Sequence, residues 1–250
     1  MLKQIGVVGD PEGFRERIAA AAPDGALVSD VDPNESSSGM LDALVVDPGM
    51  DSAVDAVLGA ADARQTLLWL LADAIDCREG APLGGSRRVC EHAGRFAKAL
   101  GLSAEETLLL ERGALLRDIG KLTISNDVLL KNSVLTYDEW ILLQKHAALG
   151  AALLEERGFC AAVADMIRGH HECYDGTGYP DGIERDAIPR FARVMKILDV
   201  YCAMTSPRHY RKTHSTHEQA IEHLASERGK HFDPELIDVF INGDVGRTDA

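Results

Sequence analysis

The alternation of apolar and polar positions divides the chain into a short first part and a longer helical part. Within residues 1–64, three apolar runs at 5–8, 26–28 and 43–46 have the length of buried strands. A helix is predicted over 11–22, because a proline suits the first position of a helix. Strands that alternate with a helix are typical of a parallel sheet, so we expect a small α/β domain here.

The chain after residue 65 has helical periodicity throughout. Apolar residues recur with helical spacing from 51 to 77, which predicts a helix that packs either on a partner helix or within its own chain. Ser103 with Glu106, and Thr136 with Glu139, have the spacing of capping boxes that open two helices. Further helices are expected at 86–100, where Ser86 is a candidate cap, at 160–172 and 189–205, and after Thr216 and Asp233, with loops at 80–86, 119–135, 174–188 and 206–215. The prediction is a mainly α protein: an all-α domain over 65–250 behind the α/β domain of 1–64.

Asp47 directly follows the third predicted strand. Phospho-receiver domains carry their phosphorylated aspartate at such a strand end, but a complete receiver needs about twice the length of 1–64. The segment is therefore at most a truncated receiver-like or sensor domain. An ordinary loop aspartate is the simpler interpretation.

The composition excludes several classes of protein. With 46% apolar and 26% charged residues, the chain is typical of globular proteins and not of collagen or disordered chains. A net charge of −14 argues against binding duplex nucleic acid, although a local basic pocket could still bind a small anion. Five cysteines without a C-x-x-C pattern predict reduced thiols and a cytoplasmic location. No apolar run approaches the roughly 18 residues of a membrane span, so we expect no contact with a membrane.

Candidate metal ligands occur at four separate places in the helical part. Asp118 lies in the run R-D-I-G-K at 117–121, His146 follows the Thr136 cap, His170 and His171 precede D-G-T-G-Y-P, and Asp199 lies within a helix. Imidazole and carboxylate groups suit iron, manganese or zinc. A bridging aspartate can hold two metal ions about 3.5–4 Å apart, as in phosphoester hydrolysis. Each residue alone is more typical of an ordinary core or surface position, so the order of the segments carries the argument.

These segments together resemble the HD-GYP family, a branch of the HD-domain metallohydrolases. HHECYDGTGYP at 170–180 resembles the signature HHE-x-x-DG-x-GYP, and LLRDIGKL at 115–122 resembles LLHDIGK. ARVMKILDVYCAMTSPRHYRK at 192–212 is similar to the segment that ends in R-P-Y-R. The resemblance covers about 66–240. It implies a helical bundle with a site for two or three metal ions, often iron or manganese, and hydrolysis of cyclic di-GMP or a related cyclic dinucleotide in bacterial signalling.

The resemblance also implies roles for individual residues. Asp118 would bridge the metal ions, and Lys121 would contact the scissile phosphate or a metal-bound hydroxide, so both are candidate catalytic residues. The remaining implied roles are metal ligation by His146, His170, His171 and Asp199, and substrate binding by Tyr179, Arg208 and Arg211.

Four positions depart from the family pattern. Arg117 replaces the histidine of the H-D pair, and Gly85 replaces the histidine of G-H-S, while Cys202 and Cys173 replace a usual aspartate and arginine. An arginine cannot ligate a metal, but it can form a charge-assisted pair with Asp118. Either one metal ion is retained and Arg117 substitutes for the other charge, or the site is free of metal. His92 lies about two turns beyond Gly85, so we expect it at the surface.

Two functions follow from this pattern. The first is a metal-dependent cyclic-dinucleotide phosphodiesterase with an altered and weakened metal site. The second is a catalytically inactive regulatory module that binds a cyclic dinucleotide or a signalling protein. A homodimer through the helix at 51–77 is a further hypothesis from its periodicity.

Overall fold

The fold is taken from a computed structural model, which describes residues 4–7, 27–30, 63–80, 84–206 and 214–247. The contacts between Cα atoms divide the chain into two compact units, residues 1–67 and 68–250. In the first unit, strands β1 (Gln4–Val7) and β2 (Leu27–Asp30) pair in parallel. The helix expected at 11–22, the strand at 43–46 and Asp47 lie outside the described residues, so the receiver-like domain stays a prediction.

The second unit is mainly helical, as its periodicity predicts. Its described elements are α4 (Ala63–Arg78), α5 (Gly85–Ala99), α6 (Ala104–Leu116), the 3-10 helix η2 (Ile119–Thr123), α7 (Asn126–Leu129), α8 (Tyr137–Glu156), α9 (Ala161–Gly169), the 3-10 helix η3 (Arg185–Ala187), α10 (Arg190–Thr205), α11 (His217–Ser226) and α12 (Pro234–Asn242). None of these helices is both long enough and apolar enough to cross a bilayer.

Both predicted capping boxes are present, and a third opens the helix expected after Thr216. Ser103 accepts a hydrogen bond from the Glu106 backbone N–H, and the Glu106 carboxylate accepts one from the Ser103 N–H. The same reciprocal pairs open α8 at Thr136 and α11 at Thr216, where they satisfy backbone donors that a helix start leaves free.

Two local predictions were wrong. Ser86 does not cap a helix, because α5 already begins at Gly85, and its hydroxyl is buried against Asp76 instead. The expected loop at 119–135 contains the short helices η2 and α7. Helices of four or five residues include too few positions to show a hydrophobic period, so the sequence could not predict them.

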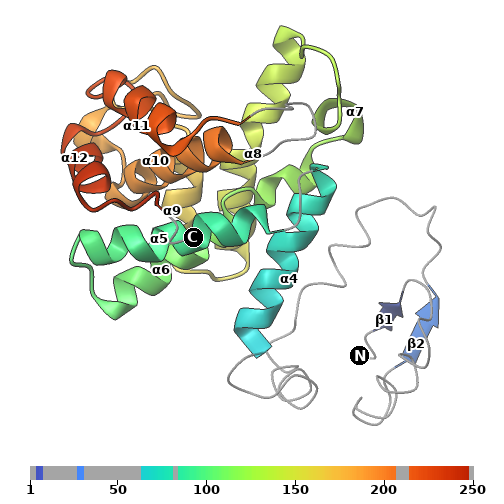
Figure 1. The fold of residues 1–250 in the computed structure, drawn as a ribbon. Helices are drawn as coiled ribbons and strands as arrows, with labels where there is room; N and C mark the ends of the chain where they lie inside the picture. The colour runs from blue at the N-terminus through green and yellow to red at the C-terminus, as the bar shows by residue number, and fades with distance from the viewer. Residues whose placement is uncertain (1–3, 8–26, 31–62, 81–83, 207–213, 248–250) are drawn as a thin grey trace. The chain divides into compact units, whose positions relative to one another are not determined.

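Two apolar clusters hold the helices together. The larger cluster joins α5, α6, α10, α11 and α12, and its aromatic centre is Phe96, Phe240 and Tyr201, with ring centroids 5.2 Å apart in both the Phe96–Phe240 and the Tyr201–Phe240 pairs. The smaller cluster joins α4, α8, α9 and the end of α6 around Leu116 and Ile167. Figure 1 shows α5 and α6 side by side. Helices α6 and α9 contribute side chains to both clusters: Leu110 and Met166 belong to the larger, and Leu116 and Ile167 to the smaller. The segments that follow these two helices therefore begin at well-packed helix ends.

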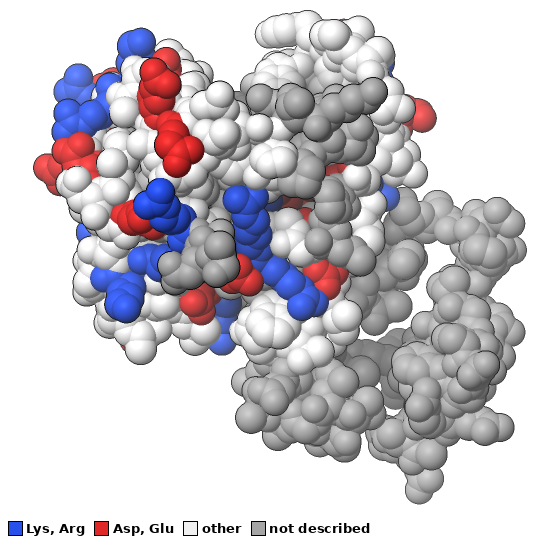
Figure 2. All heavy atoms as spheres, viewed as in Figure 1, with Lys and Arg blue, Asp and Glu red and all other residues white. Residues whose placement is uncertain are grey.

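The charged side chains are mixed on the face of the molecule drawn in Figure 2. Lysines and arginines lie beside aspartates and glutamates over the described helices. A surface that binds duplex nucleic acid gathers positive charge, and this face does not.

Candidate metal centre

Four of the five predicted metal ligands converge on one point. Asp118 lies between α6 and η2, His146 lies within α8, and His170 and His171 follow the last residue of α9. One possible ligand atom from each lies within 4.8 Å of the others. Three segments that are distant in the sequence thus place one carboxylate and three imidazoles together.

Backbone hydrogen bonds fix two of the imidazoles in the form that can bind a metal. The Nδ1–H of His146 donates to the carbonyl of Leu143 at 2.7 Å, and that of His170 donates to Ile167 at 2.6 Å. Since a carbonyl can only accept, each neutral ring leaves its Nε2 lone pair free.

The free nitrogens point to a missing ligand. The Nε2 of His170 is buried and has no hydrogen-bond partner among the described residues. The Nε2 atoms of His146 and His171 lie only 3.2 Å apart. Because the Nδ1 of His146 already carries its proton, its Nε2 accepts a hydrogen bond from the Nε2–H of His171. The Nε2 of His170 is left unpaired beside them within the described part of the chain, and since buried polar atoms are normally paired, a bound ion would satisfy it. The residues present therefore fit a metal ion.

The protonation states also suit metal binding. Burial lowers the pKa of His170 to about 4, and it lowers the pKa values of His146 and His171 as well. Burial alone would raise the pKa of Asp118, but the charges of Lys121 and Arg117 outweigh it and hold that pKa well below its usual range. At neutral pH the group thus offers three neutral imidazoles and one carboxylate.

Arg117 lies between two of the carboxylates predicted to bind metal. Its guanidinium is buried, with Nε 3.0 Å from Oδ1 of Asp199 and Nη2 3.2 Å from Oδ2 of Asp118. Its Nη1 donates to Ser86 Oγ at 3.1 Å and to the carbonyl of Ala114 at 3.0 Å. Asp199, the fifth predicted ligand, is not part of the converging group and pairs with this arginine instead.

Gly85, which the motif resemblance aligns with a histidine, is the first residue of α5. A Cβ added there would lie 3.4 Å from Oδ2 of Asp76. Asp76 is buried and accepts hydrogen bonds from the backbone N–H and the hydroxyl of Ser86, at 2.9 and 2.7 Å. The hydroxyl of Ser86 also accepts from Arg117, so Asp76, Ser86 and Arg117 form one buried network.

Lys121 connects the metal centre to a residue that the sequence did not identify. Its Nζ lies 2.8 Å from Oδ1 of Asp118 and 3.0 Å from Oε1 of Glu79, just beyond the end of α4. Burial, together with the nearby Asp118 charge, raises the pKa of Glu79. Glu79 belongs to no motif, because a single acid after a helix end gives no signal in one sequence. Lys121 thus pairs with two carboxylates, one of which is a predicted metal ligand.

The signature segment folds back onto the histidines that precede it. Tyr179 stacks on His171 with ring centroids 4.7 Å apart and an interplanar angle of 24°. Glu172 accepts hydrogen bonds from the backbone N–H groups of Asp181 and Gly182, which ties the loop to the end of α9. A Cβ at Gly178 would lie 2.2 Å from the backbone nitrogen of Cys173, so only glycine permits this approach. Tyr179 therefore borders the metal centre, and its predicted contact with substrate stays a prediction.

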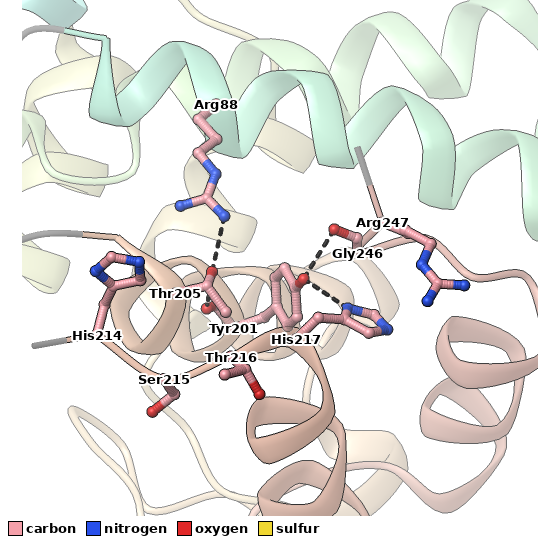
Figure 3. A pocket seen from close by; sticks show the side chains of 9 residues that line it. All are labelled: Arg88, Tyr201, Thr205, His214, Ser215, Thr216, His217, Gly246 and Arg247. Atoms are coloured by element: carbon pink, nitrogen blue, oxygen red, sulfur yellow. Dashed lines mark hydrogen bonds between the residues drawn. The ribbon is translucent and has the colours of Figure 1, made fainter. Parts of the chain in front are cut away.

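Two predicted substrate residues, Arg208 and Arg211, lie outside the described residues. A pocket of about 320 Å³ lies elsewhere, and none of the predicted metal ligands lines it. Figure 3 shows the hydroxyl of Tyr201 between His217 and the carbonyl of Gly246, at 2.9 and 2.8 Å.

His92 was expected at the surface, and this prediction was wrong: it is buried, and its Nδ1 lies 3.1 Å from the carbonyl of Val245. The α5 face that carries His92 turns towards the larger apolar cluster, away from the metal centre.

The sequence of this chain matches a known protein family. The family model described as HD domain matches residues 70–236, a span that contains all four converging ligands. The chain belongs to the HD-domain family. Its relatives place it in the HD-GYP branch of that family, which confirms the resemblance drawn from the motifs.

Three relatives illustrate the similarity of this HD-GYP protein. The cyclic di-GMP phosphodiesterase response regulator RpfG of Xanthomonas campestris pv. campestris (strain 8004) is 40% identical over 72% of this chain and 48% of its own length. The 3'3'-cGAMP-specific phosphodiesterase 2 of Vibrio cholerae serotype O1 is 32% identical over 72% of this chain and 35% of its own. A crystal structure of a cyclic GMP-AMP specific phosphodiesterase of V. cholerae, V-cGAP3, has a TM-score of 0.56 and 25% identity over 70% of this chain and 47% of that one. The chain thus spans less than half the length of each of these relatives.

Proposed function

We propose that the HD domain of this chain is a metal-dependent phosphodiesterase that hydrolyses cyclic di-GMP or a related cyclic dinucleotide. The observation that carries the proposal is the convergence of Asp118, His146, His170 and His171 around the unpaired Nε2 of His170, next to Lys121. The names of the relatives support the class of substrate.

We propose further that the site is altered and holds one metal ion, iron or manganese, with Asp118, His146, His170 and His171 as its ligands. A bound ion of this kind supplies a Lewis acid and an activated water molecule. Asp199 is held by Arg117 and is not available as a ligand in the arrangement described. Arg117 also engages Oδ2 of Asp118 and supplies a positive charge where a second ion would bind.

Lys121 would contact the phosphate directly, and the buried Arg117 would contribute a fixed positive charge behind Asp118. Burial alone would lower the pKa of Lys121, but the charges of Asp118 and Glu79 outweigh it and raise that pKa, so the amine keeps its proton. Hydrolysis breaks one phosphorus–oxygen bond as a water oxygen joins phosphorus, and a proton passes to the leaving ribose oxygen. Fixed cations beside the phosphate stabilise the charge that develops during this step.

A second function is favoured by the same arginine. The loss of one metal ion removes a stabiliser worth several kcal/mol, which is on the order of a thousandfold in rate. A chain with a single ion can therefore act as a regulatory module that binds a cyclic dinucleotide, or a signalling protein, without turnover.

Metal analysis and turnover together test these proposals. The full chain is loaded with iron(II) or manganese(II), its metal content is measured by elemental analysis, and cyclic di-GMP is followed by chromatography. We expect one ion per chain and formation of the linear dinucleotide, and we expect Asp118→Asn to lose both. Binding of the dinucleotide without turnover would select the regulatory module. A chain that binds no metal under either condition would contradict the proposed site.

Several broader expectations remain proposals. These are the sensor role of residues 1–64, the domain boundary at 64/65, a homodimer and a cytoplasmic location. The substrate contacts of Arg208 and Arg211 are proposals of the same kind.

A further inference from the structure

A row of aromatic rings leads from the metal centre towards the surface. The ring of Tyr179 stacks on the ligand His171, and the indole of Trp140 meets Tyr179 in a T-shaped contact, with centroids 6.3 Å apart and an interplanar angle of 78°. Trp140 lies on α8, six residues before His146, which corresponds to roughly 9 Å along the helix axis. The outermost ring of the row is thus within the reach of a small ligand bound at the metal centre.

The indole of Trp140 is exposed to solvent although it contacts a residue beside the buried metal centre. Its exposed fraction is 44%, whereas Tyr179 beside it is half-buried. Its helical neighbours Tyr137 and Ile141 are exposed as well. Of these three, Trp140 has the ring contact with Tyr179, and an exposed aromatic side chain at the rim of a polar site is typical of ligand-binding surfaces.

We propose that Trp140 is a base-stacking residue, whose indole binds one purine base of a cyclic dinucleotide while a phosphate of the same molecule lies at the metal centre. This inference rests on the proposed function and deepens it. A cyclic dinucleotide carries flat bases on a ring of two phosphates, so a base must lie near a phosphate that occupies the site. The indole is 44% exposed, so part of its π-system is open to a base, and its T-shaped contact with Tyr179 holds it beside the metal centre.

The chemistry also predicts how selective this contact is. Stacking tolerates different bases, because every base has a π-face. Trp140 should therefore bind guanine and adenine about equally well and should contribute affinity without choosing between cyclic di-GMP and 3'3'-cGAMP. Choice between these molecules would need hydrogen-bonding groups elsewhere in the site.

The chain offers a matched spectroscopic control. It contains two tryptophans, and the other, Trp69, lies on α4 with the Arg87 guanidinium 5.0 Å from its ring centroid. Variants Trp69→Phe and Trp140→Phe each leave a single indole. The probe is a hydrolysis-resistant phosphorothioate analogue of cyclic di-GMP, titrated into the metal-loaded full chain. We expect the ligand to quench the fluorescence of Trp69→Phe and to leave that of Trp140→Phe unchanged.

Calorimetry with the same ligand measures the contribution to affinity. We expect Trp140→Ala to bind roughly 5- to 100-fold more weakly than the unmodified chain, with unchanged metal content. Trp140→Phe should recover most of the affinity, because a phenyl ring also stacks. Tyr137→Ala removes an exposed ring from the same helix and should bind as the unmodified chain does.

The outcomes separate this inference from the proposed function. If the unmodified chain binds the analogue and Trp140→Ala binds it equally well, the stacking role is wrong and the proposed function stands. If the affinity falls equally in Trp140→Ala and Tyr137→Ala, the effect is not specific to the stacked indole and the inference is also wrong. If the unmodified chain binds no cyclic dinucleotide, both fail, and the exposed face of Tyr137, Trp140 and Ile141 is left as a surface for a protein partner.

Discussion

The Nε of Arg117 lies 3.0 Å from Oδ1 of Asp199, in the interior of the helical unit. The motif that this segment resembles has a histidine at this position, so we propose that a permanent cation stands here in place of a neutral metal ligand. The guanidinium at once occupies the two carboxylates, Asp118 and Asp199, that an additional metal ion would need. The charge of Arg117 therefore compensates the negative charges of both carboxylates.

Removal of the Arg117 charge should destabilise the fold. Arg117→Met keeps much of the volume but leaves Asp199 and Ser86 without their buried partner, at a cost of roughly 3–5 kcal/mol in the free energy of unfolding. Urea unfolding followed by circular dichroism measures this loss. Arg157→Met, at an exposed arginine, is the control and should change the free energy by about 0.5 kcal/mol or less. A similar small change in both variants would show that the buried pair contributes no net stability.

Restoration of both missing histidines should restore a metal ion. In the double variant Gly85→His, Arg117→His, the new side chain at 85 starts beside Asp76, whose carboxylate can accept from the imidazole and orient it. Asp199 is released at the same time. We expect the metal content to rise from one ion per chain to two, measured by elemental analysis after iron(II) loading. Arg117→His alone is the matched control and should stay near one ion; a double variant that also stays at one would mean that α5 and α10 are placed wrongly for a second site.

The part of the site that lies in one short segment was predictable from the sequence. His170, His171 and Tyr179 lie within ten residues of one another, and the glycine at 178 allows their loop to fold back, so one local motif contained the whole arrangement. The pairing of Arg117 with Asp199 joins residues 82 positions apart, and the choice between pairing and metal ligation depends on how α6 and α10 pack. The sequence therefore left both outcomes open.

Residues without a motif were missed for a similar reason. Glu79 and Asp76 are ordinary acids at the end of a helix, and only the tertiary fold gives them Lys121 and Ser86 as partners. The exposed position expected for His92 was wrong because one polar residue in a helix does not reveal which neighbour covers it. Hydrophobic periodicity and capping boxes predicted the longer helices. They did not predict η2 and α7, which are too short to show a hydrophobic period.

Glu79 should support metal binding from a distance. Glu79→Gln keeps the shape of the side chain but removes a carboxylate partner of Lys121, so the lysine charge is less compensated and competes more strongly with a metal ion for Asp118. Changes in such outer residues typically weaken metal affinity roughly 10- to 100-fold. Competition with a chromogenic chelator measures the dissociation constant for manganese(II). Glu156→Gln, at an exposed glutamate, should leave this constant unchanged, and an equal constant for Glu79→Gln would remove Glu79 from the site.

Acid should destabilise the fold through His92. Burial, and secondarily the Arg88 charge, lowers the pKa of His92 from 6.5 to about 4. Arg95 and His217 lower it too, whereas the hydrogen bond to the Val245 carbonyl acts in the opposite direction. Between these two values the unfolded chain binds a proton that the folded chain does not, so the stability from this residue is complete above pH 6.5 and is lost as the pH falls towards 4.

The expected size of this effect permits a direct measurement. At pH 5 the loss from His92 is on the order of 2 kcal/mol in the free energy of unfolding, because each pH unit below the unfolded pKa contributes about 1.4 kcal/mol. In His92→Gln, whose amide can still donate to Val245, the difference between pH 7.5 and pH 5 should shrink by that amount. The buried metal ligands titrate in both chains, so their contribution cancels in the comparison. His223→Gln, at an exposed histidine, is the control and should show the same difference in the free energy of unfolding between pH 7.5 and pH 5 as the unmodified chain. If His92→Gln shows that same difference, another residue causes the sensitivity to acid.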